Sequence, residues 1–310
     1  MTKKAPAKAK PALKPKDYKS HTKPTWCPGC GDFGVLASLF QAMSRLKLDP
    51  ANTLVVSGIG CSSRLPFFVK TYGFQTAHGR VLPVAIGAKI ANPDLTVIAV
   101  GGDGDGFSIG GGHLAHAVRR NPDITYVVMD NNVYGLTKGQ TSPTSPLGFK
   151  TKSTPYGSSD TPINPMAWVL ASGVSFAARG FSGNPKYLTD LIVQGIQHPG
   201  MAFIQTMSPC PTFYNTFDLW RPKLEELPDS HDPGELMQAM AQAFRDDAIP
   251  VGVLYNQVRP TLQSHTRVTN HSLKASAHDF DPCALLESYR YLHTPAGGRA
   301  RPCRLLDCPS

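Results

Sequence analysis

The sequence lacks any long apolar run and has few charged residues for its length. Its 310 residues are 41% hydrophobic and 17% charged, which is typical of a folded globular protein and not of a disordered one. No apolar stretch approaches the length that a transmembrane helix needs, so we expect no membrane span. The N-terminus also lacks the apolar region of a secretory signal. We therefore expect a cytoplasmic protein.

Acidic residues are almost absent from the N-terminal stretch. Residues 1–19 hold seven lysines and one aspartate, so most of the formal net charge of +9 lies there. A Lys/Ala/Pro composition cannot build a packed core, and we predict a disordered arm over residues 1–24. Because the positive charge sits on this arm, a nucleic-acid-binding face is not expected. Attraction to an acidic protein partner stays open as an alternative to a plain solvated tail.

Short apolar runs alternate with helical patterns along the middle of the chain. Strands are predicted over residues 52–60, 95–100, 124–130 and 201–207, and helices over residues 32–46, 79–93 and 113–121. This alternation predicts an α/β fold, with a mostly parallel sheet flanked by helices. Ligands of such folds gather at the carboxyl ends of the strands.

Three segments are predicted from composition. Residues 25–260 form the folded domain, and residues 261–310 form an irregular C-terminal extension, because the periodicity fades after Pro260. Within the domain, residues 141–165 are rich in Ser, Thr, Pro and Gly, which predicts an ordered lid or a loop that faces a partner.

The strand over residues 95–100 leads directly into a loop of glycines and aspartates. Glycines let a backbone approach a phosphate, but Asp103 and Asp105 would repel it unless a divalent cation lay between them. Asn131 or Asn132, at the end of the next strand, can complete the shell of such an ion. No Gly-x-Gly-x-x-Gly fits residues 101–112, so a dinucleotide fingerprint is disfavoured. A plain Gly/Asp turn is the other alternative.

The chain has seven cysteines but no sign of a disulfide framework. Cys27 and Cys30 form a Cys-x-x-Cys turn, whereas Cys61 and Cys210 are solitary and each follows a strand-like run. Four thiolates at strand ends suit a [4Fe–4S] cluster, with a structural zinc site as the alternative. The remaining cysteines, Cys283, Cys303 and Cys308, are predicted to be spare thiols.

Together these motifs resemble one known family. The stretches "WCPGCGDFG", "GIGCSSR", "HGR", "GDGD", "DNNVYGLTKGQTSPTS" and "SPCPTF" are similar to the β subunit of 2-oxoacid:ferredoxin oxidoreductases. The resemblance spans residues 25–260 and is strongest to enzymes that act on 2-oxoglutarate or on a range of 2-oxoacids. It implies a thiamine diphosphate-binding fold.

The resemblance also implies a cofactor set and its ligands. The β subunits of that family carry thiamine diphosphate, Mg²⁺ and one [4Fe–4S] cluster, which favours the cluster over zinc. The implied cluster ligands are Cys27, Cys30, Cys61 and Cys210, and the implied Mg²⁺ ligands are Asp103, Asn131 and the backbone carbonyl of Val133. The implied thiamine diphosphate contacts are Ile59, Gly60, Cys61, Ser62, His78, Gly79, Gly104, Asp105, Gly135 and Leu136.

The implied reaction is the oxidative decarboxylation of a 2-oxoacid, run forward or in reverse. Coenzyme A accepts the acyl group and ferredoxin accepts the electrons. An α subunit supplies the activating glutamate, so we expect an αβ or (αβ)₂ assembly that is active only as a whole. The predicted catalytic residues are Arg64, Lys138 and Leu136, and Arg64 is a candidate partner for the distal carboxylate of 2-oxoglutarate.

Three alternatives remain open. The substrate can be pyruvate or a broad set of 2-oxoacids. The chain can be a thiamine-dependent decarboxylase with a structural zinc site and no electron transfer. It can also be an electron carrier or a zinc-stabilised interaction protein without a cofactor pocket.

Overall fold

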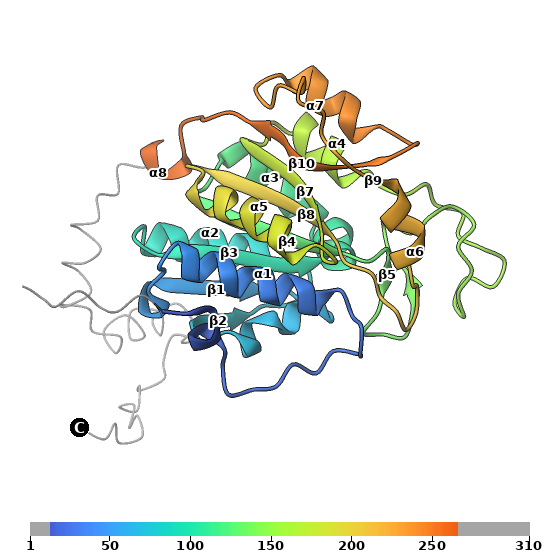
Figure 1. Ribbon diagram of the computed structural model, residues 1–310, viewed down its shortest axis with the longest axis horizontal. Coiled ribbons are helices and arrows are strands. Elements are labelled where there is room, and N and C mark those ends of the chain that lie inside the picture. The colour runs from blue at the N-terminus through green and yellow to red at the C-terminus, as the bar shows by residue number, and fades with distance from the viewer. Residues whose placement is uncertain (1–12, 266–310) are drawn as a thin grey trace, which may run out of the picture. The chain divides into compact units, whose positions relative to one another are not determined.

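A computed structural model describes residues 13–265 of the chain, and these residues belong to one compact unit. At its centre is an eight-stranded sheet (Figure 1), in which each pair of neighbouring strands is parallel except β7 and β10. In order across the sheet, the strands are β2 (Tyr72–Gln75), β1 (Thr53–Ser57), β3 (Thr96–Gly102), β4 (Ile124–Asp130), β8 (Met201–Met207), β7 (Phe176–Phe181), β10 (Ile249–Asn256) and β9 (Leu224–Glu226). The predicted α/β fold with a mostly parallel sheet is confirmed.

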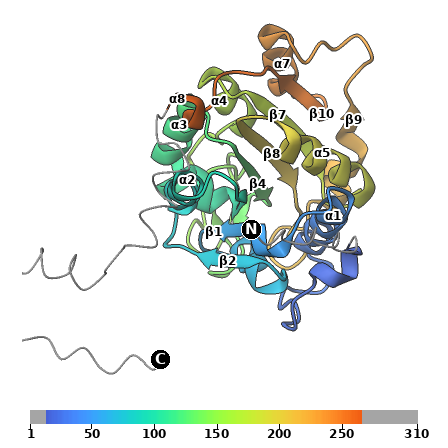
Figure 2. The ribbon, with the colours of Figure 1, turned by 90° about the vertical axis from the view of Figure 1, so that its left-hand side faces the viewer.

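Helices cover both faces of this sheet (Figure 2). One face carries α1 (Asp32–Arg45) and α5 (Pro185–Gln197), which also pack against each other. The other face carries α2 (Val81–Ala91), α3 (Gly111–Arg120) and α4 (Pro165–Ala171). The remaining α-helices of the described residues are α6 (Phe217–Trp220), α7 (Leu236–Ala243), which packs on β10 and α4, and α8 (Leu262–His265).

The local sequence explains why these elements form. Every residue of β4 and β8 is buried, as expected for central strands of a parallel sheet covered on both faces. Helix α5 begins with Pro185 after Asn184, whose side-chain oxygen accepts a hydrogen bond from the Tyr187 amide (3.3 Å). The two largest hydrophobic clusters of the described residues lie on opposite faces of the sheet.

The structure differs from the predicted disordered arm at residues 13–24. Residues Pro15–Tyr18 form a short 3₁₀ helix, and Tyr18 is fully buried. Its hydroxyl donates to the backbone carbonyls of Met43 (3.1 Å) and Leu48 (2.7 Å), and so anchors the segment to the end of α1. Composition concealed this anchor, because one buried aromatic residue suffices to fix a lysine-rich segment. Residues 1–12 lie outside the described part of the chain.

The predicted C-terminal extension is described only at its start. Leu262 opens α8, and its amide donates to the Asn121 carbonyl (3.0 Å). Residues 266–310, including Cys283, Cys303 and Cys308, lie outside the described residues. The predicted domain bounds therefore remain predictions.

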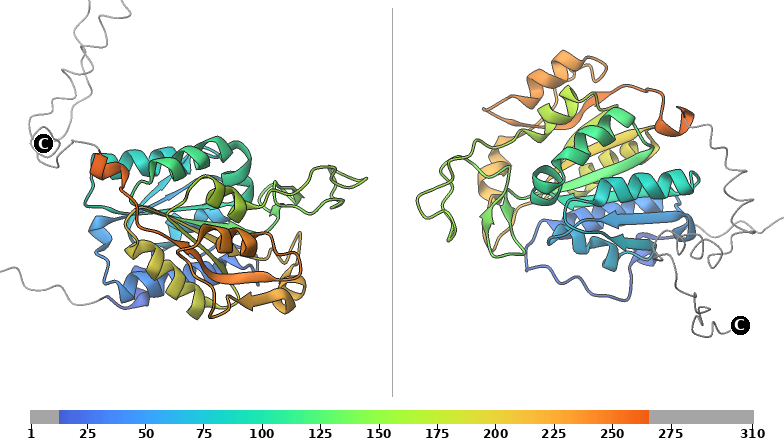
Figure 3. Two further views of the ribbon diagram at one scale, coloured as in Figure 1. Left: turned by 90° about the horizontal axis from the view of Figure 1, so that it is seen from above. Right: turned by 180° about the vertical axis from the view of Figure 1, so that it is seen from behind.

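A long connection between β6 (Gln140–Thr141) and α4 extends away from the body of the molecule (Figure 3). Its two ends meet where the Ile163 amide donates to the Pro143 carbonyl (2.8 Å). Leu147 and Tyr156 are exposed on it, the latter to 97%. No helix within residues 13–265 has the length and apolar character to cross a membrane.

Candidate active site

A pocket opens at the carboxyl ends of β1, β3 and β4, where a parallel sheet is expected to bind its ligand. Its empty volume is about 480 Å³. It is lined by Ile59, Gly60, Cys61, Ser62, His78, Gly102, Asp103, Gly104, Asp105, Asn131, Val133, Tyr134, Gly135, Leu136 and Thr137. Of the predicted thiamine diphosphate and Mg²⁺ contacts, only Gly79 is missing from this lining. Residues far apart in the sequence are thus brought to one place.

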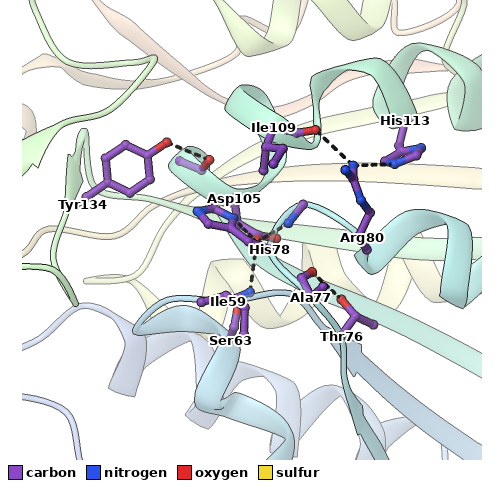
Figure 4. A network of polar contacts seen from close by, with 12 residues as sticks. Ile59, Ser63, Thr76, Ala77, His78, Arg80, Asp105, Ile109, His113 and Tyr134 are labelled. Carbon is purple, nitrogen blue, oxygen red and sulfur yellow. Dashed lines mark hydrogen bonds and ion pairs between the residues drawn. The ribbon is translucent and has the colours of Figure 1, made fainter.

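Asp105 is the centre of the hydrogen bonds that hold the pocket loops together (Figure 4). One carboxylate oxygen accepts from the amides of Ile59 (2.9 Å) and Gly79 (2.8 Å), and lies 2.8 Å from Nδ1 of His78. Asp105 is 2% exposed, and a Cβ at Gly58 would overlap its side chain. This carboxylate fixes the loops that form the wall. Contact of Asp105 with a cofactor remains a prediction.

A second buried carboxylate, Asp103, lies beside Asp130 under the pocket floor. The hydroxyls of Ser142 and Thr144 lie 2.5 and 2.8 Å from the same oxygen of Asp103, and the Thr144 hydroxyl is also 2.9 Å from Asp130. Burial raises the pKa of both carboxyls, and the charge of Asp130 raises the pKa of Asp103 further. Two neighbouring buried carboxylates favour a divalent cation, which would offset their repulsion. The residues present therefore fit Mg²⁺.

The two asparagines after β4 form a tight turn at the pocket. The side-chain oxygen of Asn131 accepts from the Val133 amide (3.0 Å), and Asn132 has a left-handed backbone with φ of 57°. The Asn132 side chain is occupied elsewhere, because it donates to the Asp130 carboxylate (2.8 Å). This turn leaves Asn131 and Val133 in the lining, where the sequence predicted two of the Mg²⁺ ligands.

Several polar residues around the floor escaped the sequence reasoning. Asp130 accepts from the Gln205 side chain (2.8 Å), and Gln205 in turn accepts from buried Arg179 (3.0 Å). Burial lowers the pKa of Arg179 to about 10, while Asp130 opposes that change. Together with Ser142 and Thr144, these side chains form one buried network. The hydroxyl-rich stretch "TSPTS" was the available signal, but it was interpreted as loop composition and as part of a family motif, with no role given to Ser142 or Thr144.

Backbone contacts bring three cysteine-bearing segments together. The Cys30 amide donates to the Cys27 carbonyl (3.1 Å), which closes the Cys-x-x-Cys turn, and the Gly31 amide donates to Pro209 (3.0 Å), beside Cys210. The indole of Trp26 donates to the Cys61 carbonyl (2.7 Å). The Sγ atoms of Cys61 and Cys210 lie 3.6 and 3.7 Å from the point where a Cβ at Gly135 would stand.

The thiols are close enough to influence one another electrostatically. Burial raises the pKa of Cys30, and nearby Asp32, Cys210 and Cys61 raise it further. Burial also raises the pKa of Cys61 to about 11, with smaller contributions from Asp32 and Cys210. Thiolates in such a place would need compensating positive charge, and a bound iron–sulfur cluster would supply it.

No group of three or more His, Cys, Asp or Glu side chains in the described residues is arranged to hold a single metal ion. A four-iron cluster occupies more space than one ion, so its thiolates stand farther apart than the ligands of one ion. Four cysteines from three converging segments fit a [4Fe–4S] cluster better than a tetrahedral zinc ion. Ligation itself remains a prediction.

The three predicted catalytic residues occupy different positions. Leu136 is 39% exposed and lines the pocket. Arg64 lies outside the lining, donates to the Thr25 hydroxyl (2.9 Å), and lowers the pKa of Cys61 through its charge. Lys138 is exposed in the turn between β5 (Val133–Tyr134) and β6, with φ of 87°. The structure therefore brings Leu136 to the pocket and leaves the two cations near its edges.

Two protein-family models match the chain. The model "Thiamine pyrophosphate enzyme, C-terminal TPP binding domain" matches residues 58–206, which include the pocket loops. A model of the C-terminal part of the pyruvate ferredoxin oxidoreductase beta subunit matches residues 210–271.

Similar proteins agree with these matches. The beta subunit of a 2-oxoacid:ferredoxin oxidoreductase from Aeropyrum pernix is 43% identical over 262 residues, which are 80% of this chain and 85% of that protein. A 2-oxoglutarate oxidoreductase subunit, KorB, from Mycobacterium tuberculosis is 44% identical over 67% of this chain and 56% of its own length. Among solved structures, a 2-oxoglutarate:ferredoxin oxidoreductase from Magnetococcus marinus, with 2-oxoglutarate, coenzyme A and succinyl-CoA bound, aligns with a TM-score of 0.80 and 43% identity. The alignment covers 91% of this chain and 97% of that one.

Proposed function

Because the chain belongs to the family of 2-oxoacid:ferredoxin oxidoreductase β subunits, we propose that it binds thiamine diphosphate, Mg²⁺ and a [4Fe–4S] cluster. With an α subunit it converts a 2-oxoacid, foremost 2-oxoglutarate, and coenzyme A to an acyl-CoA and CO₂. The conversion releases one proton and two electrons, and each ferredoxin takes one electron. The same residues serve the reverse reaction.

The pocket lining is the observation that carries this proposal. Its walls come from the segments after β1, β2, β3 and β4, and they contain the predicted thiamine diphosphate and Mg²⁺ contacts except Gly79. Gly79 lies directly behind the wall, where its amide donates to Asp105 (2.8 Å). A site for another ligand would not be expected to collect the same residues.

The glycines and carboxylates of the floor have complementary tasks. A Cβ at Gly104 would overlap the ring of Tyr134, so only glycine allows this ring to pack against the loop that would hold the diphosphate. Asp103, Asn131 and the Val133 carbonyl would hold Mg²⁺, with Ser142 and Thr144 fixing the Asp103 carboxylate. When bound, thiamine diphosphate supplies the carbanion that attacks the keto carbon and the electron sink for decarboxylation.

Cys61 connects the pocket with the thiol set, by which we mean Cys27, Cys30, Cys61 and Cys210. It lines the pocket and lies beside Cys210. A cluster held by Cys27, Cys30, Cys61 and Cys210 would therefore adjoin the cofactor and would pass on electrons singly. This proximity is what an enzyme that splits a two-electron oxidation into two steps requires.

The substrate assignment rests on relatives and on Arg64. Several relatives carry names that specify 2-oxoglutarate, and Arg64 lies near Cys61, whose pKa it lowers. The Arg64 guanidinium would give up its hydrogen bond to Thr25 and pair with the distal carboxylate of 2-oxoglutarate instead. Lys138, at the other edge, is proposed to contact substrate or coenzyme A.

The decisive experiment uses the chain co-expressed with its α subunit and purified anaerobically. We expect iron and acid-labile sulfide, and reduction of a viologen dye by 2-oxoglutarate in the presence of coenzyme A. Cys210→Ala should lose the iron, whereas Cys283→Ala, the matched control, should keep it. An iron-free wild-type complex that contains zinc would instead support the decarboxylase alternative.

Arg64→Ala tests the substrate in the same assay. We expect kcat/KM for 2-oxoglutarate to fall about tenfold or more, as for the loss of a charge-assisted contact. Pyruvate has no distal carboxylate, so its kcat/KM should change little. Equal losses for both acids would remove Arg64 from this role.

A further inference from the structure

An open groove lies beside the Cys-x-x-Cys turn, on the outer side of α1. One wall is the extended segment 19–24, and the floor includes the aromatic rings of Phe33, Phe40 and Phe68. The empty volume is about 700 Å³, larger than that of the cofactor pocket. None of these residues has a task in the reaction proposed above.

The wall of the groove has a defined position. Lys19 pairs with Val69 in an antiparallel bridge, and the Ser20 amide donates to the Phe68 carbonyl (3.0 Å). On the other side of the bridge, the Lys70 amide donates to the Tyr18 carbonyl (2.7 Å). The buried Tyr18 anchors the same segment to α1. A surface held in this way can present side chains to a partner without ordering them first.

Positive charge gathers along this wall and the segment that precedes it. Lys14, Lys16, Lys19 and Lys23 are all exposed, and exposed Lys70 adjoins them.

The acids near the wall are few. Asp17 and Asp49 lie on the Tyr18 side, where both raise the Tyr18 pKa in addition to the effect of burial. The sequence before residue 13 adds four lysines and no acid. The groove thus has an apolar floor and a basic rim, which is complementary to an acidic protein surface.

The groove also adjoins the thiol set. The ring of Trp26 meets Phe33 and Phe68 edge-on, with ring centroids 5.4 and 4.9 Å apart, and its indole donates to the Cys61 carbonyl (2.7 Å). Next to Trp26, Cys27 is the exposed member of the four described thiols. One indole therefore separates the groove floor from the Cys61 loop.

We propose that this groove and its lysines form the docking surface for the acidic iron–sulfur protein that removes the electrons. The inference rests on the proposed function, because only a cluster held by these thiols makes this face an electron exit. The lysines steer the carrier by charge, and the aromatic floor accepts an apolar side chain of it. A carrier seated here lies next to Cys27, so the electron has a short path out of the protein.

The test uses the anaerobic αβ complex with the double variant Lys19→Glu and Lys23→Glu. The matched control is Arg119→Glu with Arg120→Glu, which makes the same change in net charge. These two exposed arginines end α3, on the opposite face of the sheet. Each complex is assayed with 2-oxoacid, coenzyme A and either a viologen dye or a ferredoxin of negative net charge. Calorimetry measures the Kd of ferredoxin independently of turnover.

We expect the double lysine variant to raise both the KM and the Kd for ferredoxin about tenfold or more at low salt, with dye reduction unchanged. The ferredoxin affinity of the wild type should fall as salt rises, and that of the variant should fall less. Replacing both lysines by glutamine should give an intermediate effect. The arginine control should behave as the wild type.

Two outcomes would overturn the docking surface while the proposed function stands. In the first, the lysine variant reduces dye normally and binds ferredoxin as tightly as the wild type. In the second, the lysine and arginine variants weaken ferredoxin binding equally, which would indicate an effect of net charge alone. A wild-type complex that reduces no dye with any 2-oxoacid contradicts the proposed function itself.

Discussion

The hydroxyl of Thr144 joins the two buried carboxylates of the site. It lies 2.8 Å from Asp103 and 2.9 Å from Asp130. Ser142 approaches the same Asp103 oxygen (2.5 Å), so two hydroxyls hold the carboxylate of the proposed Mg²⁺ ligand. Loss of a residue that orients a metal ligand typically lowers the metal affinity about 10- to 100-fold.

Thr144→Val should therefore weaken Mg²⁺ binding about 10- to 100-fold in the αβ complex, because valine keeps the shape and removes the hydroxyl. Thr144→Ser should restore affinity. The measurement is calorimetry of thiamine diphosphate binding at increasing concentrations of Mg²⁺. If valine and serine variants bound Mg²⁺ equally, the hydroxyl would have no positioning role.

Among the elements, the 3₁₀ helix Pro15–Tyr18 depends on one side chain. The Tyr18 hydroxyl is the donor to two backbone carbonyls at the end of α1 and in the turn that follows it. The groove wall, which pairs with Val69 through Lys19, is held by this segment. Its stability therefore bears on the docking surface as well as on the fold.

Tyr18→Phe should lower the free energy of unfolding by about 1–2 kcal/mol, because buried acceptors lose their donor while the ring stays packed. Urea unfolding of the complex measures the change. Tyr156→Phe is the control, since Tyr156 is 97% exposed and should have no effect. An unchanged Tyr18→Phe variant would mean that water replaces the lost donor.

His198 connects the end of α5 with the sheet. Its Nε2 lies 2.9 Å from the Ser175 hydroxyl, and the side chain is buried. Burial lowers the pKa of His198, so the folded chain holds this proton less tightly than the unfolded chain does. The contribution of His198 to stability is then complete above the ordinary histidine pKa and is lost as the pH falls below it.

We therefore expect stability to decrease on acidification from the ordinary histidine pKa of 6.5 downward, and His198→Gln to make that decrease shallower. Thermal unfolding across this pH range provides the measurement. Exposed His116→Gln is the control and should leave the slope as it is. Identical pH profiles for wild type and His198→Gln would show that other groups dominate.

At the scale of the whole molecule, the cofactor pocket raises the question of which residue supplies the carboxylate that activates thiamine diphosphate. The lining of the cofactor pocket, within the described residues, contains aspartates and no glutamate, and both of its aspartates are engaged by other groups. The activating carboxylate that thiamine chemistry needs is thus proposed to come from the α subunit. The extended loop between β6 and α4 begins at the same floor, through Ser142 and Thr144.

The purified chain alone should show no dye reduction with any 2-oxoacid, even when loaded with thiamine diphosphate and Mg²⁺. Adding the α subunit should restore turnover. The comparison is made anaerobically at equal concentrations of chain, with iron content as the check that the cluster is intact. Turnover by the isolated chain would locate the activating acid within it.

Prediction from sequence succeeded for strands whose signal lies in neighbouring residues. The strands β1, β3, β4 and β8 were predicted because each is a continuous apolar run between turn residues. The strands β7 and β10 were missed, because β7 contains the buried Arg179 and β10 is interrupted by Pro250 and Gly252. A charged residue such as Arg179 fits inside a strand only when the fold supplies a hydrogen-bond partner, and here Arg179 donates to Gln205 (3.0 Å).

By itself, the sequence determined the family, the α/β alternation and the motifs that meet at the strand ends, because those signals are local. Tertiary structure alone decided which way each polar group faces. It directed the Asp105 carboxylate to the amides of Ile59 and Gly79. It also buried Tyr18 in a segment whose composition predicted disorder. The reason is physical: a buried polar atom must find a partner, and that partner is chosen by the fold and not by the neighbouring residues.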